Sequence, residues 1–367
     1  MQIAIVGLPG AGKTTVFNAL TGSHAETGGY GGLTVNVGVV KVPDARLAAL
    51  TALCQPRREV AADVTYVDLP APPRPVDGQG GANDLPADQL ARLRNADALL
   101  HVVRAFEDPT VPHPEGSVDP WRDLERLDLE FTLADYDVAR RRLERLDTSG
   151  RHGTPAEREA NERERAVLER IVPALAEGRP VRDLGLEPDE AARVRGFRFL
   201  TEKPVLAVLD IGEADIPRAE DLVASIRSRY DHRDSLVAAL SARIEAEIAE
   251  LDEDAAAAFR ADLGLDESGL ERVIRLSYRL LGLISFFTAG PDETRAWTIR
   301  DGSTAVDAAG AIHSDLARGF IRAEVVPVDE LLALGSTAEA RRAGKLRSEG
   351  KTYRVRDGDV IEVLFNV

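Results

Sequence analysis

This chain of 367 residues contains almost no cysteine and little histidine. Its single cysteine, Cys54, has no partner for an internal disulfide, and one thiol cannot make a cysteine-rich zinc site. The six histidines are scattered along the sequence without the spacing of a zinc ligand set. Stability must therefore come from packing, and we expect Cys54 to act as a small hydrophobic residue.

The chain has fewer basic than acidic residues, and it lacks long apolar runs. The 46 Lys and Arg residues oppose 62 Asp and Glu residues, and the net charge of -16 excludes a generally basic nucleic-acid-coating protein. We expect no sequence-specific DNA binding. No stretch approaches the roughly 20 apolar residues of a membrane helix, and the first residues show no signal-peptide pattern. We therefore expect a cytoplasmic protein without a membrane partner.

The most specific motif lies at the start of the chain. An apolar run from Gln2 to Val6 is followed by the loop Gly7-Leu8-Pro9-Gly10-Ala11-Gly12-Lys13-Thr14-Thr15 and then by apolar residues at helical spacing. In such a loop, glycines let backbone N–H groups surround phosphates, the lysine reaches the terminal phosphates and the threonine binds Mg²⁺. The pattern predicts a nucleotide site whose phosphate contacts come from Gly10, Ala11, Gly12, Lys13, Thr14 and Thr15.

A second strand supplies the acidic residue that such a site requires. The run from Val64 to Asp68 reads as a strand, so Asp68 is the predicted Mg²⁺ group, with a surface turn aspartate as the alternative. The glycine-rich stretch 27–34 reads as a switch in which Thr34 adds a second hydroxyl to the metal when a γ-phosphate is present. Continuous apolar runs at 98–103 and 204–209 are typical of strands in a covered parallel sheet, which predicts an α/β fold.

Further sequence blocks follow in order, and together with the phosphate loop they resemble the Obg-like ATPase family (YchF type), a branch of the translation-factor-related P-loop GTPases. The likeness covers almost the whole chain. The blocks that carry it include Asn36-Val37-Gly38-Val39-Val40, His101-Val102-Val103-Arg104, Glu115-Gly116-Ser117-Val118-Asp119-Pro120, Ser241-Ala242-Arg243-Ile244-Glu245, Phe287-Thr288-Ala289-Gly290 and Gly319-Phe320-Ile321-Arg322-Ala323-Glu324-Val325.

The resemblance implies three parts: a P-loop GTPase-like domain at 1–123 and 199–283, a helical coiled-coil insertion at 124–198, and a ubiquitin-like TGS domain of β-grasp fold at 284–367. The residues support each part independently. Two helices are expected around a break at 150–153, and Thr154-Pro155-Ala156-Glu157 fits a capping box at the start of the second. The tail alternates strand-like pieces (296–299, 320–326, 353–355 and 360–365) with a helix from Thr304 to His313.

The first predicted helix carries a run of arginines for which two interpretations stay open. They either form i,i+4 ion pairs on a solvated face or contact RNA or the ribosome. The residues concerned are Arg140, Arg141, Arg142 and Arg145.

Two features near the metal site bear on hydrolysis. Members of the family continue the aspartate strand as Asp-x-x-Gly, and that glycine N–H senses the γ-phosphate; here Ala71 offers the N–H, and the flanking prolines stiffen the loop. No glutamine follows to orient water. The resemblance instead implies His113 as the group that orients or activates water, with a solvated loop histidine as the alternative.

The base-binding segment also departs from the pattern. GTPases use Asn-Lys-x-Asp and the family uses Asn-x-x-Glu, whereas this chain has Asp210-Ile211-Gly212-Glu213. Asp210 can accept from the adenine 6-amino group but cannot donate to N7, and Glu213 is able to accept from guanine. ATP is the favoured nucleotide, with GTP open. The next strand should end at Ser241 and Ala242, whose backbone N–H groups would face the base.

The leading hypothesis is a slow, Mg²⁺-dependent triphosphatase that hydrolyses ATP, or GTP, with Lys13 and His113 as catalytic residues. The resemblance implies the ribosome as its partner. A nucleotide-binding interaction module with impaired hydrolysis is the main alternative, suggested by Ala71 and Asp210. A small-molecule P-loop kinase shares the loop pattern but explains neither the tail domain nor the Ser241-Ala242 block.

Overall fold

The structure is a computed structural model that describes residues 1–23, 25, 35–69, 86–149, 154–265 and 267–366. The chain divides into two compact units. The first comprises Met1–Gly38 and Thr65–Val273, and the second comprises Val39–Val64 and Ile274–Val367. Each unit is described by itself.

The first unit is built on a sheet with strand order β2-β4-β1-β5-β6-β7. Its strands are β2 (Asn36–Lys41), β4 (Asp63–Asp68), β1 (Gln2–Val6), β5 (Ala98–Ala105), β6 (Val205–Ile211) and β7 (Ser235–Leu240). From β4 to β7 every neighbouring pair is parallel. Strands β5 and β6 are buried along nearly their whole length, as their continuous apolar runs predict. The predicted α/β class is confirmed.

Parallel pairing brings the carboxyl ends of these strands to one edge of the sheet, where ligands of open α/β folds bind. Val6 at the end of β1 pairs with His101 of β5, and Arg104 near the end of β5 pairs with Asp210 of β6. Helix α1 (Lys13–Thr21) follows β1 directly, and α8 (Ala242–Ala249) follows β7. The remaining helices of this sheet are α3 (Ala87–Asn95), η4 (Glu213–Arg218), α7 (Ala219–Arg227) and α9 (Glu253–Asp262). Helix α10 (Gly269–Leu280) begins in this unit.

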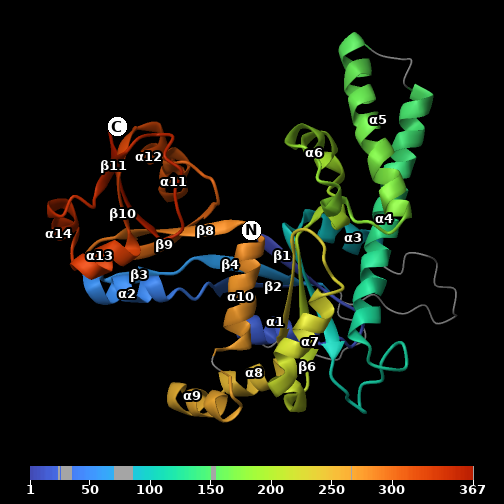
Figure 1. The fold of residues 1–367 in the computed structure, drawn as a ribbon, viewed down its shortest axis with the longest axis horizontal. Coiled ribbons are helices and arrows are strands. Elements are labelled where there is room, and N and C mark those ends of the chain that lie inside the picture. Colours follow the sequence, from blue (N-terminus) through green and yellow to red (C-terminus); the bar gives the residue numbers. More distant parts are fainter. Residues whose placement is uncertain (24, 26–34, 70–85, 150–153, 266, 367) are drawn as a thin grey trace. The chain divides into compact units, whose positions relative to one another are not determined.

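A long helical hairpin leaves this unit, with α4 (Pro120–Ser149) and α5 (Pro155–Ala176) side by side in Figure 1. The predicted capping box is confirmed, because Thr154 accepts from the Glu157 N–H while the Glu157 carboxylate accepts from the Thr154 N–H. Apolar side chains from both helices form one core, which includes Ala139, Leu146, Leu168 and Ile171. Short elements follow: η1 (Val181–Leu184), α6 (Pro188–Val194), η2 (Arg195–Phe197) and η3 (Leu200–Glu202).

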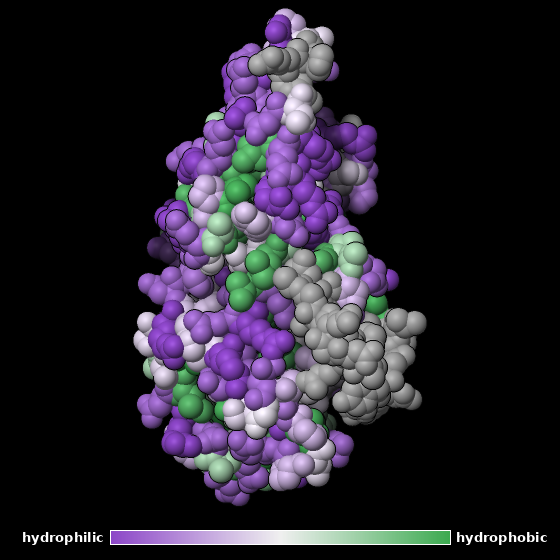
Figure 2. Space-filling view, turned by 90° about the vertical axis from the view of Figure 1, so that its right-hand side faces the viewer, coloured by the Kyte–Doolittle hydropathy of each residue, from purple (hydrophilic) through white to green (hydrophobic). Residues whose placement is uncertain are grey.

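The arginines of the hairpin are engaged in ion pairs. Arg140 lies 2.7 Å from Glu144, and Arg142 lies 2.8 Å from Glu164 of the other helix. Arg141 lies 3.4 Å from Asp137. Hydrophilic residues predominate on the face seen in Figure 2, with hydrophobic residues in small groups. Arg140 and Arg141 thus form i,i+4 ion pairs, whereas Arg142 pairs across the hairpin. Contact of these arginines with RNA or the ribosome stays a prediction.

The second unit contains a mixed sheet with strand order β11-β10-β12-β8-β9-β3. Its strands are β3 (Arg58–Val60), β8 (Leu283–Ala289), β9 (Glu293–Arg300), β10 (Phe320–Pro327), β11 (Arg347–Glu349) and β12 (Asp359–Phe365). Helix α11 (Ala305–Ile312), which starts at the cap residue Thr304, packs Ala305, Ala308 and Ala309 against the sheet core. The other helices are α2 (Ala45–Cys54), α12 (Ser314–Arg318), α13 (Val328–Leu334) and α14 (Thr337–Arg342).

Two features of this unit differ from the sequence predictions. The stretch 353–355 is not a strand: only an isolated bridge joins Arg354 to Thr304, because the flanking turns leave no room for a ladder. Residues 39–64 group with the C-terminal part, because β3 pairs with β9 in parallel and Arg46 of α2 forms an ion pair with Asp357. The exact three-part division of the chain stays a prediction.

None of the helices in the described parts of the chain combines the length and apolar character that a membrane crossing requires.

Candidate nucleotide-binding site

The phosphate loop connects β1 to α1 and depends on glycine at two positions. Gly12, the residue before α1, has φ 91°, and a Cβ there would overlap the carboxylate of Asp210. A Cβ at Gly7 would overlap the carbonyl oxygen of Val102 on the neighbouring strand. Because Gly12 has no side-chain acceptor, the N–H groups of the first turn of α1, which includes Lys13, Thr14 and Thr15, point out of the helix end. The motif predicts that these N–H groups bind phosphate, and their placement at the helix end is consistent with that prediction.

Lys13 lies across its own loop. Its Nζ donates to the carbonyl oxygens of Gly7 and Leu8, both at 3.0 Å, and the residue is 9% exposed. Burial lowers the pKa of the Lys13 ammonium to about 8, although the nearby Asp68 carboxylate opposes the shift. His101, fully buried on β5, faces the same region; burial and the charge of Lys13 lower its pKa to about 3, so it stays neutral. Lys13 is therefore the only charged group of this pair.

Asp68 ends β4 beside the first turn of α1. Its Oδ2 accepts from Thr14 Oγ1 at 3.1 Å and from Asn36 Nδ2 at 3.3 Å. Its Oδ1 is buried and has no hydrogen-bond partner among the described residues. Burial raises the pKa of this carboxyl, while Asn36, Thr14 and Lys13 lower it. An unpartnered carboxylate oxygen next to a threonine hydroxyl is the donor set that Mg²⁺ prefers, so the residues present fit this ion.

Two predicted site residues, Thr34 and Ala71, lie outside the residues that the structure describes. The other predicted phosphate-loop residues occupy the expected turn. Gly10 is exposed and Ala11 is buried, while Thr14 and Thr15 are half-buried at the start of α1.

Asp210 joins the phosphate loop to the start of α8. Its Oδ1 accepts from the Ala242 N–H at 2.9 Å, and its carboxylate lies against Gly12. Burial raises the pKa of the Asp210 carboxyl to about 7, opposed by the Ala242 N–H and by the charge of Arg104. The Ala242 N–H, which we predicted to face the nucleotide base, thus donates to Asp210 instead.

The remaining predicted base-site residues are less closely grouped. Ser241 is buried at the cap of α8, and the Ile211 side chain packs in the core, which leaves only its backbone for a ligand. Glu213 is exposed and lines a separate hollow with Ile216, Asp262 and Leu263. The structure therefore brings Asp210 and Ala242 together, and it places the Glu213 side chain at this other hollow.

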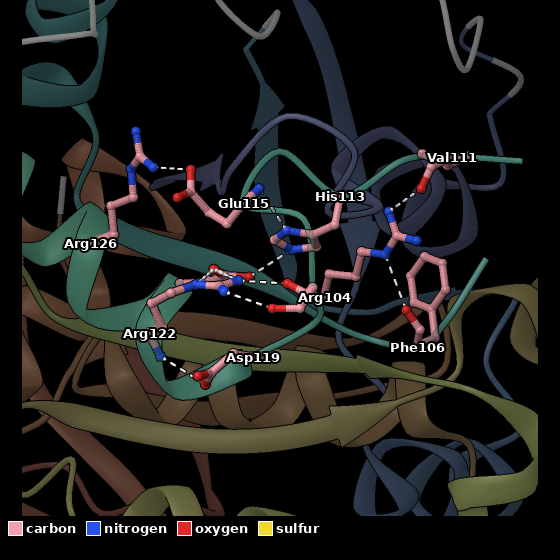
Figure 3. A network of polar contacts seen from close by, with 10 residues as sticks. Arg104, Phe106, Val111, His113, Glu115, Asp119, Arg122 and Arg126 are labelled. Carbon is pink, nitrogen blue, oxygen red and sulfur yellow. Dashed lines mark hydrogen bonds and ion pairs between the residues drawn. The ribbon is translucent and has the colours of Figure 1, made fainter. Parts of the chain in front are cut away.

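His113 lies in a small hollow beside the phosphate loop, lined also by Leu8, Pro9 and Asp123. Its imidazole is 5% exposed. Nδ1 accepts from the Glu115 N–H at 3.1 Å (Figure 3). Nε2 lies 2.8 Å from Asp123 Oδ2. Among the described residues no hydrogen-bond donor is well aligned with Asp123 Oδ2, so the short Nε2–Oδ2 contact has a bent geometry. The solvated-loop alternative for His113 is wrong, because the ring is buried and contacts protein at both nitrogens.

Arg104 holds the loop that carries His113. It is 2% exposed and donates to the carbonyl oxygens of Phe106, Asp108 and Val111 at 3.1, 3.3 and 2.8 Å. Its guanidinium also stacks over the Phe106 ring, 4.7 Å from the centroid. Figure 3 shows the Arg104 guanidinium reaching from β5 to Val111, on the loop that also carries His113. Arg104 therefore has a structural role that its strand position alone did not reveal.

Sequence reasoning missed two residues that touch the site. Asn36 binds Asp68 from β2, and the only signal for it was its place at the start of a family block. Asp123 contacts His113 from the first turn of α4, and no sequence spacing marks this pair. Both contacts arise from chain segments that meet only in the folded protein.

The sheet order, the glycine loop at the start of α1 and the buried acid of β4 define a P-loop nucleotide-binding protein. Residues 2–132 match the family described as 50S ribosome-binding GTPase, and residues 283–366 match the C-terminal family of YchF GTPases, described as a protein of unknown function.

Relatives match over the whole length. The chain is 41% identical over 371 residues to the ribosome-binding ATPase YchF of Bacillus subtilis (strain 168), with 100% of both chains covered. It is 39% identical to that of Escherichia coli O157:H7, with 100% of this chain and 99% of the relative covered. The solved structure of the Schizosaccharomyces pombe YchF GTPase has a TM-score of 0.84 at 30% identity, with 99% and 97% covered. The chain belongs to the YchF family, as its sequence blocks predict.

The raised pKa of Asp210 leads to a stability prediction. An aspartate is ionised above about pH 4 in the unfolded chain, whereas Asp210 ionises only near pH 7 in the folded protein. The stabilising effect of a protonated Asp210 is therefore fully present below about pH 4. It is lost as the pH rises to about 7, because the unfolded chain releases this proton first. Asp210→Asn keeps an acceptor for the Ala242 N–H and removes this loss.

We expect the stability advantage of Asp210→Asn over the wild type to be about 2 kcal/mol larger at pH 8 than at pH 5.5. Urea unfolding of both proteins at the two pH values measures this difference. An equal effect at both pH values would show that Asp210 is ionised in the folded protein throughout this range.

Proposed function

We propose that this chain binds a nucleoside triphosphate together with Mg²⁺, hydrolyses it to diphosphate and phosphate, and acts with the ribosome in the cytoplasm. The observation that carries the chemistry is the convergence of Lys13, Thr14 and the unpartnered Asp68 Oδ1 at the start of α1. We propose the ribosome as the partner because the relatives carry the name ribosome-binding ATPase, and residues 2–132 match a ribosome-binding GTPase family.

Phosphoryl transfer to water is mainly a problem of positioning and charge. The N–H groups from Gly10 to Thr15 hold the phosphate oxygens, and Lys13 exchanges its two carbonyl partners for the terminal phosphates. Thr14 and Asp68 would hold Mg²⁺, with Thr34 as the proposed second hydroxyl. Bound there, the ion neutralises charge on the phosphate oxygens. The N–H of Ala71 is the proposed contact to the γ-phosphate.

His113 is the proposed group that orients the attacking water. Its ring shares a hollow with Leu8 and Pro9 of the phosphate loop. In the structure its Nδ1 accepts from a backbone N–H and its Nε2 lies against a carboxylate, so neither nitrogen is free to accept from water. His113 must therefore exchange a protein contact for water before it acts. This engagement of both nitrogens favours a second candidate, a nucleotide-binding module with very slow hydrolysis.

ATP is the proposed substrate. Asp210 has no donor for purine N7 when it is ionised, and its carboxylate accepts from an exocyclic amino group such as that of adenine. Glu213 lies at another hollow in this structure, so the acceptor that would favour guanine is not beside Asp210. A contribution of Ser241 and of the backbone at Ile211 to the base site remains part of the proposal.

The test is steady-state phosphate release with Mg²⁺-ATP and Mg²⁺-GTP, for the wild type and for His113→Ala. We expect a higher kcat/KM for ATP than for GTP. We also expect kcat for ATP to fall about 10²-fold in His113→Ala with little change in KM, since removal of a water-orienting group affects the chemical step. His313→Ala, at an exposed histidine of the second unit, is the matched control and should leave the rate unchanged.

Each result has a clear meaning. Equal, near-background rates in wild type and His113→Ala would favour the binding module over the hydrolase. Phosphate found on an added small-molecule acceptor rather than in water would favour a kinase.

A further inference from the structure

The loop that carries His113 is fixed at several points by arginines. Arg104 holds its first half through three carbonyl oxygens. Arg126 of α4 forms an ion pair with Glu115, and Arg122 donates to the Ser117 carbonyl oxygen at 2.7 Å. These contacts place the loop against the first two turns of α4, as Figure 3 shows.

Within this network, Asp123 is the residue that faces the His113 ring. Its Oδ1 accepts from Arg122 Nε at 3.0 Å and Nη2 at 2.8 Å, so the carboxylate has a fixed orientation. Its Oδ2 then lies 2.8 Å from His113 Nε2. The Asp123 side chain is 4% exposed, so water does not compete for this contact.

The two contacts of the ring also determine which nitrogen carries the proton. Nδ1 accepts from the Glu115 N–H and therefore carries no proton. A bare Nε2 lone pair 2.8 Å from a carboxylate oxygen would be repelled, so the proton is on Nε2, and its contact with Asp123 Oδ2 is short but bent. In this position neither nitrogen is open to a water molecule.

We propose that Asp123 is a positioning residue that holds His113 in a docked state, and that release of His113 from Asp123 limits the basal rate of hydrolysis. This inference rests on the proposed role of His113. Asp123 lines the same hollow as His113, but its carboxylate is held between Arg122 and His113, so it acts on the reaction through His113. Because Asp123 lies in the first turn of α4, the helix that continues into the hairpin, a displacement of α4 also moves the docking carboxylate.

The test substitutes Asp123→Asn in the wild type and in His113→Ala. The amide keeps the size of the side chain and the acceptor for Arg122, but its N–H₂ group cannot accept the Nε2 proton. We expect kcat for Mg²⁺-ATP to rise about 3- to 10-fold with KM unchanged, as the docked fraction falls. In the His113→Ala background the same substitution should leave kcat unchanged.

Asp119→Asn is the matched control. Asp119, the residue before α4, accepts from the Arg122 N–H at 3.1 Å, and it is not among the residues that line the hollow of His113. It should leave kcat at the wild-type value. A rise in kcat that is equal for Asp119→Asn and Asp123→Asn would overturn the proposal, since loosening of α4 would then be the cause.

A spectroscopic measurement on the wild type does not depend on any variant's folding. In protein with ¹⁵N-labelled histidine, long-range proton–nitrogen correlation should show His113 with the proton on Nε2, the peak being assigned by its loss in His113→Ala. We expect Asp123→Asn to shift this signal and Asp119→Asn to leave it in place. A proton on Nδ1 in the wild type would overturn the docked state.

The outcomes distinguish failure of the proposed function from failure of the docking proposal. Absence of ATP hydrolysis in the wild type, or a wild-type kcat in His113→Ala, would overturn the proposed function at this residue. A kcat in Asp123→Asn that is equal to or below the wild type, beside an impaired His113→Ala, would overturn only the docking proposal.

Discussion

Lys13→Ala is expected to lower kcat/KM for ATP by about 10²- to 10³-fold, the range seen when one preorganised group that stabilises developing charge is removed. Lys13 belongs to the phosphate loop itself, and its Nζ rests on the Gly7 and Leu8 carbonyl oxygens. A triphosphate offers that ammonium full negative charges in place of carbonyl dipoles. Phosphate release by the purified variant measures the loss.

The fold should survive this substitution. The lowered pKa of Lys13 means that the folded protein disfavours the charged form relative to water, so removal of the ammonium does not remove a stabilising charge. The melting temperature of Lys13→Ala should therefore stay close to that of the wild type. Lys41→Ala, at an exposed lysine of β2, is the matched control and should retain full activity. Retained activity in Lys13→Ala would contradict the assignment of the phosphate site.

The same pKa gives the sign of a pH effect on binding. With a pKa of about 8, a substantial part of Lys13 is neutral at pH 8, and bound phosphate favours the charged form. ATP binding should thus take up protons near pH 8, and affinity should fall as the pH rises further. Calorimetric titration with ATP in buffers of different ionisation enthalpy measures this proton uptake, which Lys13→Ala should lack because it has no ammonium group.

The parts of the fold that depend on local sequence were predictable. The strand, glycine loop and helix at the N-terminus are consecutive in sequence, and so are the four residues of the Thr154 capping box. Their structure follows from backbone conformation and short-range hydrogen bonds. For the same reason, Lys13 and Thr14 could be assigned before any contact was known.

The parts that depend on distant contacts were not predictable in this way. Strand-like residues at 353–355 form a single bridge, since turns flank them in the folded chain, and the sequence alone does not identify a ladder partner. Strand β3 pairs with β9 across more than half of the chain. The docking of His113 likewise needs α4 to lie beside the loop, which no residue spacing encodes. The resemblance implied His113 but not its partner.

Asp128→Ala is expected to lower the free energy of unfolding by about 3–5 kcal/mol, because it leaves a buried arginine without its carboxylate. The Arg182 side chain is 3% exposed, and its Nη2 lies 3.7 Å from Asp128 Oδ2. Tyr230 donates to the same oxygen at 2.8 Å. This group joins α4 to η1 and to the segment after α7, so its loss should weaken the base of the hairpin.

Urea unfolding of Asp128→Ala beside Glu125→Ala tests this value, since Glu125 is exposed on the same helix and its removal should change stability by less than about 0.5 kcal/mol. Arg182→Met in the Asp128→Ala background separates a lost contact from an isolated charge. If the isolated guanidinium causes the loss, this second substitution should restore part of the stability, because methionine fills similar space without a charge. A double variant less stable than Asp128→Ala alone would show instead that the remaining contacts of Arg182 with Tyr230 and Thr201 stabilise the fold.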